Sequence, residues 1–381
     1  MNYPPYCPNP KCGNHQFDHP YRSHWYWHKG HYHPPSGGSY RRFQCKECKA
    51  IFTMRTFSID YFTKKKVSYQ RILSGIISCS SIRALSRALN CNTETIQNRI
   101  RRLARNMIAC SQLISGDIVP QENGIYTADG LESFITSQFF PTNINILVGK
   151  TSQFIYDFSY FVFKRKGRMT ERQKEIMEEL YKTVEFEEKG ATRSFNEILT
   201  SLHSRISKDP SSRCILDTDE NRIYRSCLKS HPELGQLLKR GELIHRLTSS
   251  KKKRNFKNKL FPVNYIDREI RKDLAEHVRE TVRFGRSSSN AMERFGIYLF
   301  WHNYLKPFRI NRKNRTSDTH GEAAGCDPVR MERYLRIVYR YRIPYSFVEN
   351  KLTTFLTTVW EHRVHTPAGM NRQRLPKFLL G

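Results

Sequence analysis

The stretch ILDTDENRIY, residues 215–224, constrains the fold more than any other part of the chain. A short apolar run passes directly into acidic residues, and a helix-like segment follows, which is typical of a strand that ends where a helix begins. Asp217 and Asp219 are two residues apart, so on a strand they point to the same face. The stretch therefore predicts a strand over residues 214–219 with carboxylates at its carboxyl end.

The flanking segments extend this prediction to a whole domain. Four further segments rich in β-branched and aromatic residues are predicted as strands: 125–129, 144–148, 154–163 and 243–247. Segments with helical spacing or dense charge are predicted as helices: 170–189, 191–206, 220–239, 263–283 and 290–304. Three strands, a helical stretch and then alternating strand and helix predict an α/β (α+β) layer with helices on both faces of the sheet.

This order of elements places acidic residues close to one another. Asp129 is predicted to end the first strand, Asp219 ends the fourth, and Glu293 lies one turn into the last helix. Such a cluster repels itself unless a cation is bound, and Mg²⁺ or Mn²⁺ prefers these hard oxygen ligands. Asp217 remains an alternative to Asp219, and Glu280 an alternative to Glu293.

Two cysteine pairs in the first fifty residues predict a structural metal site. Cys7 and Cys12 form the first pair, Cys45 and Cys48 the second, and together they can hold one tetrahedral Zn²⁺. Six histidines interleaved with aromatic residues separate the pairs; a hairpin that stacks on DNA, a second metal site and an exposed arm all remain open. The six other cysteines are scattered and are expected to be ordinary thiols.

Residues 64–112 predict a helix-turn-helix module. Apolar residues recur at helical spacing up to Leu89, Asn92 is suited to cap a new helix, and the pattern then resumes at Ile96. Two short helices joined by a tight turn are the plan of many DNA-reading modules. The second helix carries polar and basic residues expected to contact DNA: Thr95, Gln97, Asn98, Arg101, Arg102 and Arg105.

The charge of the chain indicates a polyanionic partner. The 65 Lys and Arg outnumber the 35 Asp and Glu, which gives a formal charge of +30. Six basic residues between the predicted acids are expected to contact a DNA backbone: Lys251, Lys252, Lys253, Arg254, Lys257 and Lys259. We find no apolar run long enough to span a membrane, no signal peptide and no Gly-rich nucleotide loop, so we expect a cytoplasmic protein without membrane partner or nucleotide cofactor.

Three motifs give the chain a resemblance to a known family. Residues ADGLESF (128–134), Thr218-Asp219-Glu220 with Tyr224, and NAMERF (290–295) with WHNY (301–304) resemble prokaryotic insertion-sequence transposases of the DDE type. The resemblance implies a zinc ribbon (residues 1–60, including the His-rich insertion), the helix-turn-helix module (64–112) and a ribonuclease H-like catalytic domain (120–310). It also implies a charged helical insertion at about 168–208, and we expect a basic helical extension over 311–381.

The same resemblance implies a function. Asp129, Asp219 and Glu293 would bind Mg²⁺ and catalyse cleavage and strand transfer at the terminal inverted repeats. The partners would be double-stranded DNA, both element ends and target, and a second copy of the chain on the nucleoid. Two alternatives remain, namely a zinc-ribbon transcription regulator without catalysis and a nuclease of the same fold that cuts without joining.

Overall fold

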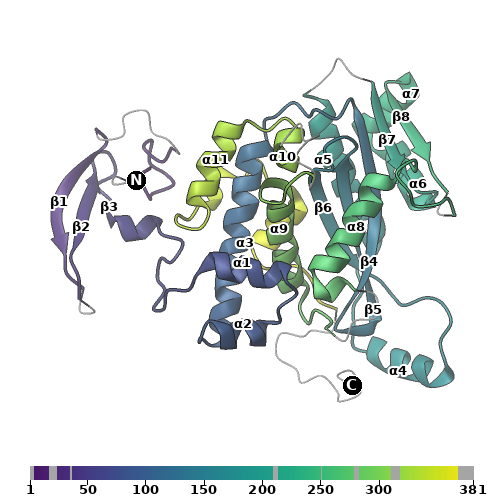
Figure 1. The fold of residues 1–381 in the computed structure, drawn as a ribbon, viewed down its shortest axis with the longest axis horizontal. Coiled ribbons are helices and arrows are strands. Elements are labelled where there is room, and N and C mark those ends of the chain that lie inside the picture. The colour runs from purple at the N-terminus through teal and green to yellow at the C-terminus, as the bar shows by residue number, and fades with distance from the viewer. Residues whose placement is uncertain are drawn as a thin grey trace.

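The computed structural model describes residues 4–16, 24–34, 37–208, 213–249, 251–278, 283–309 and 318–367. Buried apolar residues form two cores: a small one between Tyr6 and Phe57, and a large one between Ile59 and Val364. The small core belongs to an N-terminal module at one end of the molecule (Figure 1). The Tyr6 hydroxyl joins it to the rest by donating to the Arg342 carbonyl oxygen at 3.1 Å.

The N-terminal module is a small antiparallel sheet in the order β1-β2-β3. Its strands are β1 (Tyr26–Tyr32), β2 (Tyr40–Cys45) and β3 (Ile51–Thr53), followed by the short helix η1 (Met54–Phe57). One face of the sheet is packed, because Phe43 and Phe52 are opposite each other and both are buried. The segment between the cysteine pairs therefore includes a β-hairpin.

Three helices follow: α1 (Tyr69–Ile77), α2 (Ile82–Ala88) and α3 (Thr93–Ser115). The Asn92 side chain accepts a hydrogen bond from the Glu94 amide, so it caps α3 as the sequence indicates. However, α3 is 23 residues long, and the prediction of a short second helix was wrong. Its C-terminal half is buried along α9 (Ser288–Tyr304), where a Cβ on Gly296 would lie 3.0 Å from Ile108 Cδ1. The helical module thus shares the large core.

The central sheet has five strands in the order β6-β5-β4-β7-β8. Its strands are β4 (Ile125–Ile135), β5 (Ser137–Gly149), β6 (Ile155–Val162), β7 (Cys214–Thr218) and β8 (Leu243–Leu247). The first three strands pair antiparallel, whereas β7 pairs parallel with both β4 and β8. The sheet is therefore mixed, and helices carry the chain between the parallel strands.

Helices cover both faces of this sheet. The remaining ones are α4 (Glu171–Tyr181), α5 (Gly190–Ile206), α6 (Arg222–Ser230), α7 (Pro232–Arg240), α8 (Phe261–Asp273), η2 (Ala275–His277), α10 (His320–Ala323), α11 (Pro328–Ile337), η4 (Tyr345–Phe347) and α12 (Thr354–Trp360). Along β6, the Ser159 hydroxyl contacts the Ser194 hydroxyl of α5 at 2.5 Å. On the other face of the sheet, Phe158 contacts Phe295 of α9, and the Tyr160 hydroxyl contacts the Ser288 hydroxyl of α9. The predicted α/β class is confirmed at this level.

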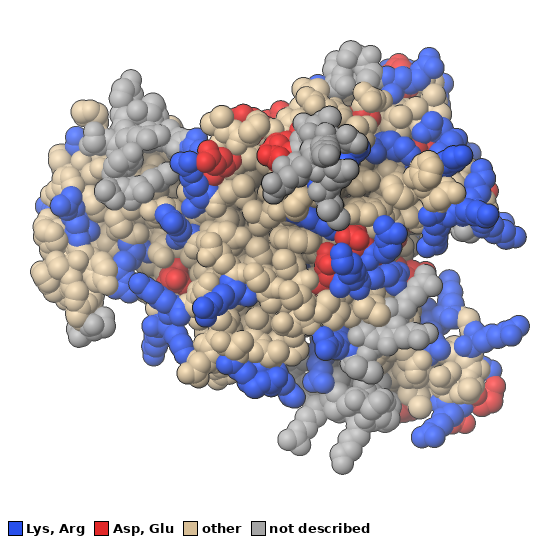
Figure 2. All heavy atoms as spheres, in the orientation of Figure 1, with Lys and Arg blue, Asp and Glu red and all other residues tan. Residues whose placement is uncertain are grey.

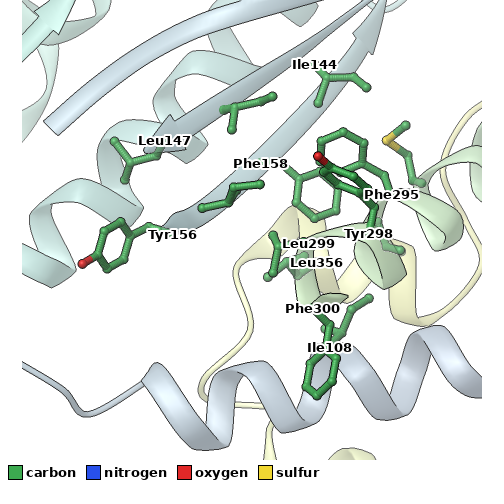
Figure 3. Packing of buried hydrophobic residues seen from close by; sticks show 14 of the residues in the cluster. Ile108, Ile144, Leu147, Tyr156, Phe158, Phe295, Tyr298, Leu299, Phe300 and Leu356 are labelled. Carbon is green, nitrogen blue, oxygen red and sulfur yellow. The ribbon is translucent and has the colours of Figure 1, made fainter. Parts of the chain in front are cut away.

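Aromatic packing joins α9 to the sheet on one side and to α3 on the other. The rings of Phe158 and Phe295 are 4.6 Å apart between centroids, and Figure 3 shows them facing each other. In the same view, Phe300 of α9 lies beside Ile108 of α3. Since α3 and α9 pack together in this way, the helical module and the sheet domain have a continuous hydrophobic core.

Several predicted boundaries change in the structure. Strand β4 continues six residues beyond Asp129, so Asp129 lies inside the strand rather than at its end. The helix predicted over 220–239 is two helices, because His231 precedes Pro232 and adopts extended backbone angles. The predicted helix over 263–283 is α8, which ends at Asp273 where Leu274 turns extended. The helices after residue 318 pack into the large core, whereas residues 310–317 and 368–381 lie outside the described part.

Candidate functional site

The strand register places Asp129 and Asp219 beside each other. Strands β4 and β7 run parallel, with Thr127 opposite Asp217. Asp129 follows Thr127 by two residues and Asp219 follows Asp217 by two residues, so the two aspartates occupy equivalent positions on neighbouring segments. The pairing of β4 with β7 stops at Thr127 and Asp217, and β7 itself ends at Thr218. Both aspartates line a cavity of about 690 Å³.

A third aspartate, Asp267 of helix α8, lines the same cavity. Helix α8 packs against β4 and β5 and brings Asp267 to the face of the sheet from which Asp129 projects. Sequence reasoning missed this residue. It lies within the charged run Asp267-Arg268-Glu269, and helical spacing alone does not tell which of these side chains reaches the cavity.

Burial and neighbouring acids perturb the carboxylates of Asp129 and Asp219. Burial raises the pKa of Asp129 to about 8, and the negative charges of Asp267 and Asp219 contribute to the increase. Burial also raises the pKa of Asp219, with a contribution from Glu220. The Gly130 amide donates to Asp129 Oδ1 at 2.8 Å and the Asn221 amide to Asp219 Oδ1 at 2.9 Å, which orients both carboxylates.

The cavity contains side chains of the ligand type that divalent cations prefer. Four carboxylates line it, those of Asp129, Glu132, Asp219 and Asp267, and carboxylates are hard oxygen donors. A bound cation would relieve the repulsion that adds to burial in raising the pKa of Asp129. Ligands of one Mg²⁺ lie within about 4.2 Å of each other, because Mg²⁺–oxygen bonds are about 2.1 Å long. Among the described residues, only the four cysteines bring three or more potential ligand atoms within 4.8 Å. The aspartates therefore surround the cavity without converging on one point.

Asp217 has a different environment from Asp219. Its carboxylate is fully buried and accepts two hydrogen bonds of 2.7 Å from Arg246 of the neighbouring strand β8. Asp219 lies just past the end of β7, so strand alternation no longer relates the two side chains. The structure assigns Asp217 to an ion pair and Asp219 to the cavity.

The structure does not bring Glu293 to this cavity. The Glu293 side chain is 2% exposed, and its Oε1 lies 2.7 Å from His362 Nδ1 and 3.3 Å from Arg101 Nε. These partners come from α3 and from the segment after α12, so Glu293 joins three distant parts of the chain. At the cavity, Glu132 of β4 and Asp267 of α8 accompany Asp129 and Asp219 instead. Its alternative, Glu280, lies outside the described residues.

Basic side chains surround the acidic cavity. Lys252 and Arg254 from the predicted basic loop line it together with Arg268 and Arg271 of α8. The other loop cations, Lys251, Lys253, Lys257 and Lys259, are exposed. The positive charge of Arg254 acts to lower the pKa of Asp129, which shows that the loop approaches the acids. Acidic side chains inside the cavity are therefore bordered by basic ones.

The predicted DNA-contacting face of the second helix is largely used inside the protein. Arg102 donates 2.8 Å hydrogen bonds to the carbonyl oxygens of Ile59 and Tyr61, and Arg105 donates one to Trp360. Arg101 is 2.9 Å from His362 as well as being paired with Glu293. Because these three guanidinium groups fasten α3 to distant segments, the expectation that they contact DNA bases is not supported by their geometry. Thr95 and Gln97 are half-buried, and Asn98 is exposed.

The four N-terminal cysteines form a compact cluster. Their sulfur atoms all lie within 4.8 Å of one another, with 3.5 Å between Cys7 and Cys48 and 3.6 Å between Cys12 and Cys45. Tetrahedral zinc with bonds of about 2.3 Å requires sulfur atoms about 3.8 Å apart, so the cluster could bind a structural zinc ion. The Asn14 side chain donates hydrogen bonds of 3.8 and 3.7 Å to the sulfurs of Cys12 and Cys45, which fixes their positions.

The surface of the molecule reflects the positive net charge of the sequence. Figure 2 shows Lys and Arg spread over this face of the molecule, with far fewer Asp and Glu. No helix among the described residues is long and apolar enough to cross a membrane.

Comparison with protein-family models and with curated proteins finds no match to this chain.

Proposed function

We propose that the protein is a DDE-type transposase that cleaves DNA and joins it to a target by phosphoryl transfer. The observation that carries the proposal is the cavity lined by Asp129, Asp219 and Asp267 and surrounded by cations. The resemblance of the motifs around Asp129 and Asp219 to insertion-sequence transposases supports it from the sequence. In this proposal Asp267 takes the role that the sequence assigned to Glu293.

The fold supports the same proposal. A mixed sheet with helices on both faces, and with acids on the neighbouring segments β4 and β7, is compatible with a ribonuclease H-like catalytic domain. Asp219 follows the carboxyl end of β7, which is the part of such sheets where ligands commonly bind, and Asp129 lines the same cavity from within β4. The cysteine cluster and the three-helix module are compatible with the zinc-ribbon and helical parts that the resemblance implies.

Each group of residues has a defined task in this reaction. Asp129, Asp219 and Asp267 would hold Mg²⁺ or Mn²⁺, which supplies activation of the attacking oxygen and stabilisation of the leaving oxygen at phosphorus. Lys252 and Arg254 hold the phosphodiester over the acids by charge. The backbone amides of Gly130 and Asn221 orient the carboxylates of Asp129 and Asp219 toward their ligand.

The DNA partners follow from this chemistry. The substrate is double-stranded DNA at the ends of the element, and the second substrate is target DNA. Because strand transfer requires two ends in one complex, we propose that two copies of the chain assemble on DNA.

One assay separates the proposal from its alternatives. Purified protein is incubated with Mn²⁺, a labelled DNA fragment carrying the sequences that flank the coding region, and a plasmid target. A joined product supports the transposase. A cut product without joining would indicate a nuclease, and binding without any metal-dependent product would indicate a regulator.

Paired variants assign the activity to the cavity. Asp129→Asn removes a cavity carboxylate with little change in size and should abolish both cutting and joining. Glu332→Gln is the matched control, because Glu332 forms an exposed ion pair with Arg336 at a distance from the cavity. If Asp129→Asn keeps full activity, the cavity is not the catalytic centre.

A further inference from the structure

One face of the N-terminal sheet exposes an unusual set of apolar and aromatic side chains. Trp27 is 47% exposed, Tyr32 45% and Ile51 55%, whereas most of the other large hydrophobic side chains in the module are buried. Exposed aromatic groups of this size on a folded module mark a surface that binds a partner.

The register shows that these side chains share a single face. Residues directly opposite in antiparallel strands point to the same side of the sheet. Trp27 is opposite Gln44, Gln44 is opposite Ile51, and Tyr32 is opposite Tyr40. Since Tyr40 and Gln44 are four residues apart on β2, all of these side chains project to one side, which we call the outer face.

A β-bulge produces this alignment. Trp27 and Tyr32 are five residues apart, so a regular strand would place them on opposite faces. The register shifts between His28 and His31, where Gly30 has a positive φ of 71°. The bulge inserts one extra residue and returns Tyr32 to the side of Trp27. The opposite face carries Phe43 and Cys45, which are buried in the small core.

Cations accompany the rings of the outer face. The Lys49 ammonium group lies 4.7 Å from the centre of the Trp27 ring, and the Arg55 guanidinium lies 4.7 Å from that of Tyr40. The described residues between 4 and 57 include seven basic side chains and one acidic one, Glu47, which is used in hydrogen bonds to Gly13 and Asn14. The module stays positive even if zinc and four thiolates contribute a charge of about −2.

We propose that the outer face binds single-stranded nucleic acid by stacking unpaired bases on Trp27 and Tyr32. A partner for this face must be anionic and must offer flat apolar rings, and nucleic acid with exposed bases meets both requirements. In a duplex the base faces are already stacked on one another, so these rings have less to contact. Trp27 and Tyr32 are about 13 Å apart along the strands, which three or four nucleotides span at a spacing of about 3.4 Å.

This inference concerns a surface far from the aspartate cavity and requires no catalysis. In the proposed transposase it would hold a strand that is unpaired at an element end. The two proposals can fail separately, because binding of a single strand is measured without a divalent cation.

The test is fluorescence anisotropy of a labelled oligo(dT) of twelve nucleotides with full-length, zinc-loaded protein in magnesium-free buffer. Loss of one stacking ring weakens binding roughly 5- to 100-fold, so we expect this effect for Trp27→Ala. Trp27→Phe retains a ring and should stay within about threefold of wild type. Phe62→Ala removes an 85% exposed ring outside the outer face and should leave the affinity unchanged.

Two further probes define the ligand. An abasic strand of equal length carries the same charge without bases and should bind more weakly than oligo(dT). A twelve-base-pair duplex should be insensitive to Trp27→Ala. The proposal is overturned if Trp27→Ala binds oligo(dT) within twofold of wild type while its zinc content is unchanged. Equal affinity for the abasic strand, or an equal loss of duplex binding in Trp27→Ala, would also overturn it.

Discussion

Replacing Glu293 should destabilise the protein without abolishing its chemistry. The Glu293 carboxylate is 2% exposed and contacts both Arg101 and His362, so Glu293→Gln leaves two cationic or hydrogen-bonding groups without their negative partner. Removing one member of a buried ion pair costs about 3–5 kcal/mol. The Arg101 side chain is 32% exposed and regains some hydration, which reduces the expected loss to about 2–3 kcal/mol.

This loss of unfolding free energy can be expressed as a decrease in melting temperature. The large core links residues from Ile59 to Val364, so this part should unfold as a unit. With an unfolding entropy of roughly 2.1 cal/mol/K per residue over about 300 residues, a loss of 2–3 kcal/mol lowers the melting temperature by about 3–5 °C. Calorimetry of Glu293→Gln measures the shift, and a cleavage assay on the folded protein measures the activity.

The exposed pair between Glu332 and Arg336 provides the control. Glu332→Gln removes a similar charge pair in solvent and should change stability by less than about 0.5 kcal/mol. An unchanged melting temperature for Glu293→Gln, together with complete loss of cleavage, would refute the structural role and restore Glu293 as a catalytic acid.

Three further predictions follow from the site. The pKa of Asp129 is about 8 in the folded protein and 3.8 in the unfolded chain, so its contribution to stability is fully present below about pH 4 and is lost as the pH rises to 8. The melting temperature of metal-free Asp129→Asn minus that of wild type should therefore increase between pH 5 and 9. A difference that stays constant over this range would contradict the prediction. Cys45→Ser should lose the bound zinc, as measured by elemental analysis, whereas Cys91→Ser, at a half-buried cysteine outside the cluster, should keep it. The large core should stay folded in both variants. Equal zinc content in the two variants would argue against zinc binding by the cysteine cluster. Asp217→Asn should lower the free energy of unfolding by about 3 kcal/mol, because Arg246 loses its charged partner, and should keep cleavage activity per folded molecule. Asp219→Asn should lose cleavage activity with little change in the denaturant midpoint. The reverse pattern would exchange the roles of the two aspartates.

The sheet and the cysteine cluster could be predicted because their signals are local. Runs of apolar, β-branched and aromatic residues located all five strands of the central sheet, and the spacing of Cys7, Cys12, Cys45 and Cys48 indicated that they converge. The extent of β4 was missed because Asp129-Gly130 has the composition of a turn. Gly130 fits inside the strand since a Cβ there would lie 2.3 Å from Asn143 Nδ2, a close approach that only the paired strand reveals.

The third acid could not be predicted, because its position depends on how helices pack. Asp267 and Glu269 are both on α8, yet Asp267 lines the cavity while Glu269 pairs with Lys306. Glu293 has the expected spacing on α9, but that helix packs against α3 and directs the carboxylate to Arg101. The arginines of α3 were misread for the same reason, since Arg101 and Arg105 contact His362 and Trp360, which lie more than 250 residues away in sequence.

The most direct test of the central claim is Mn²⁺-dependent nicking of supercoiled plasmid by Asp267→Asn, compared with Glu293→Gln at equal concentrations of folded protein. If the aspartate cavity is the catalytic centre, Asp267→Asn loses nicking to the background of the metal-free reaction and Glu293→Gln stays within a few-fold of wild type. Full nicking by Asp267→Asn would contradict the account.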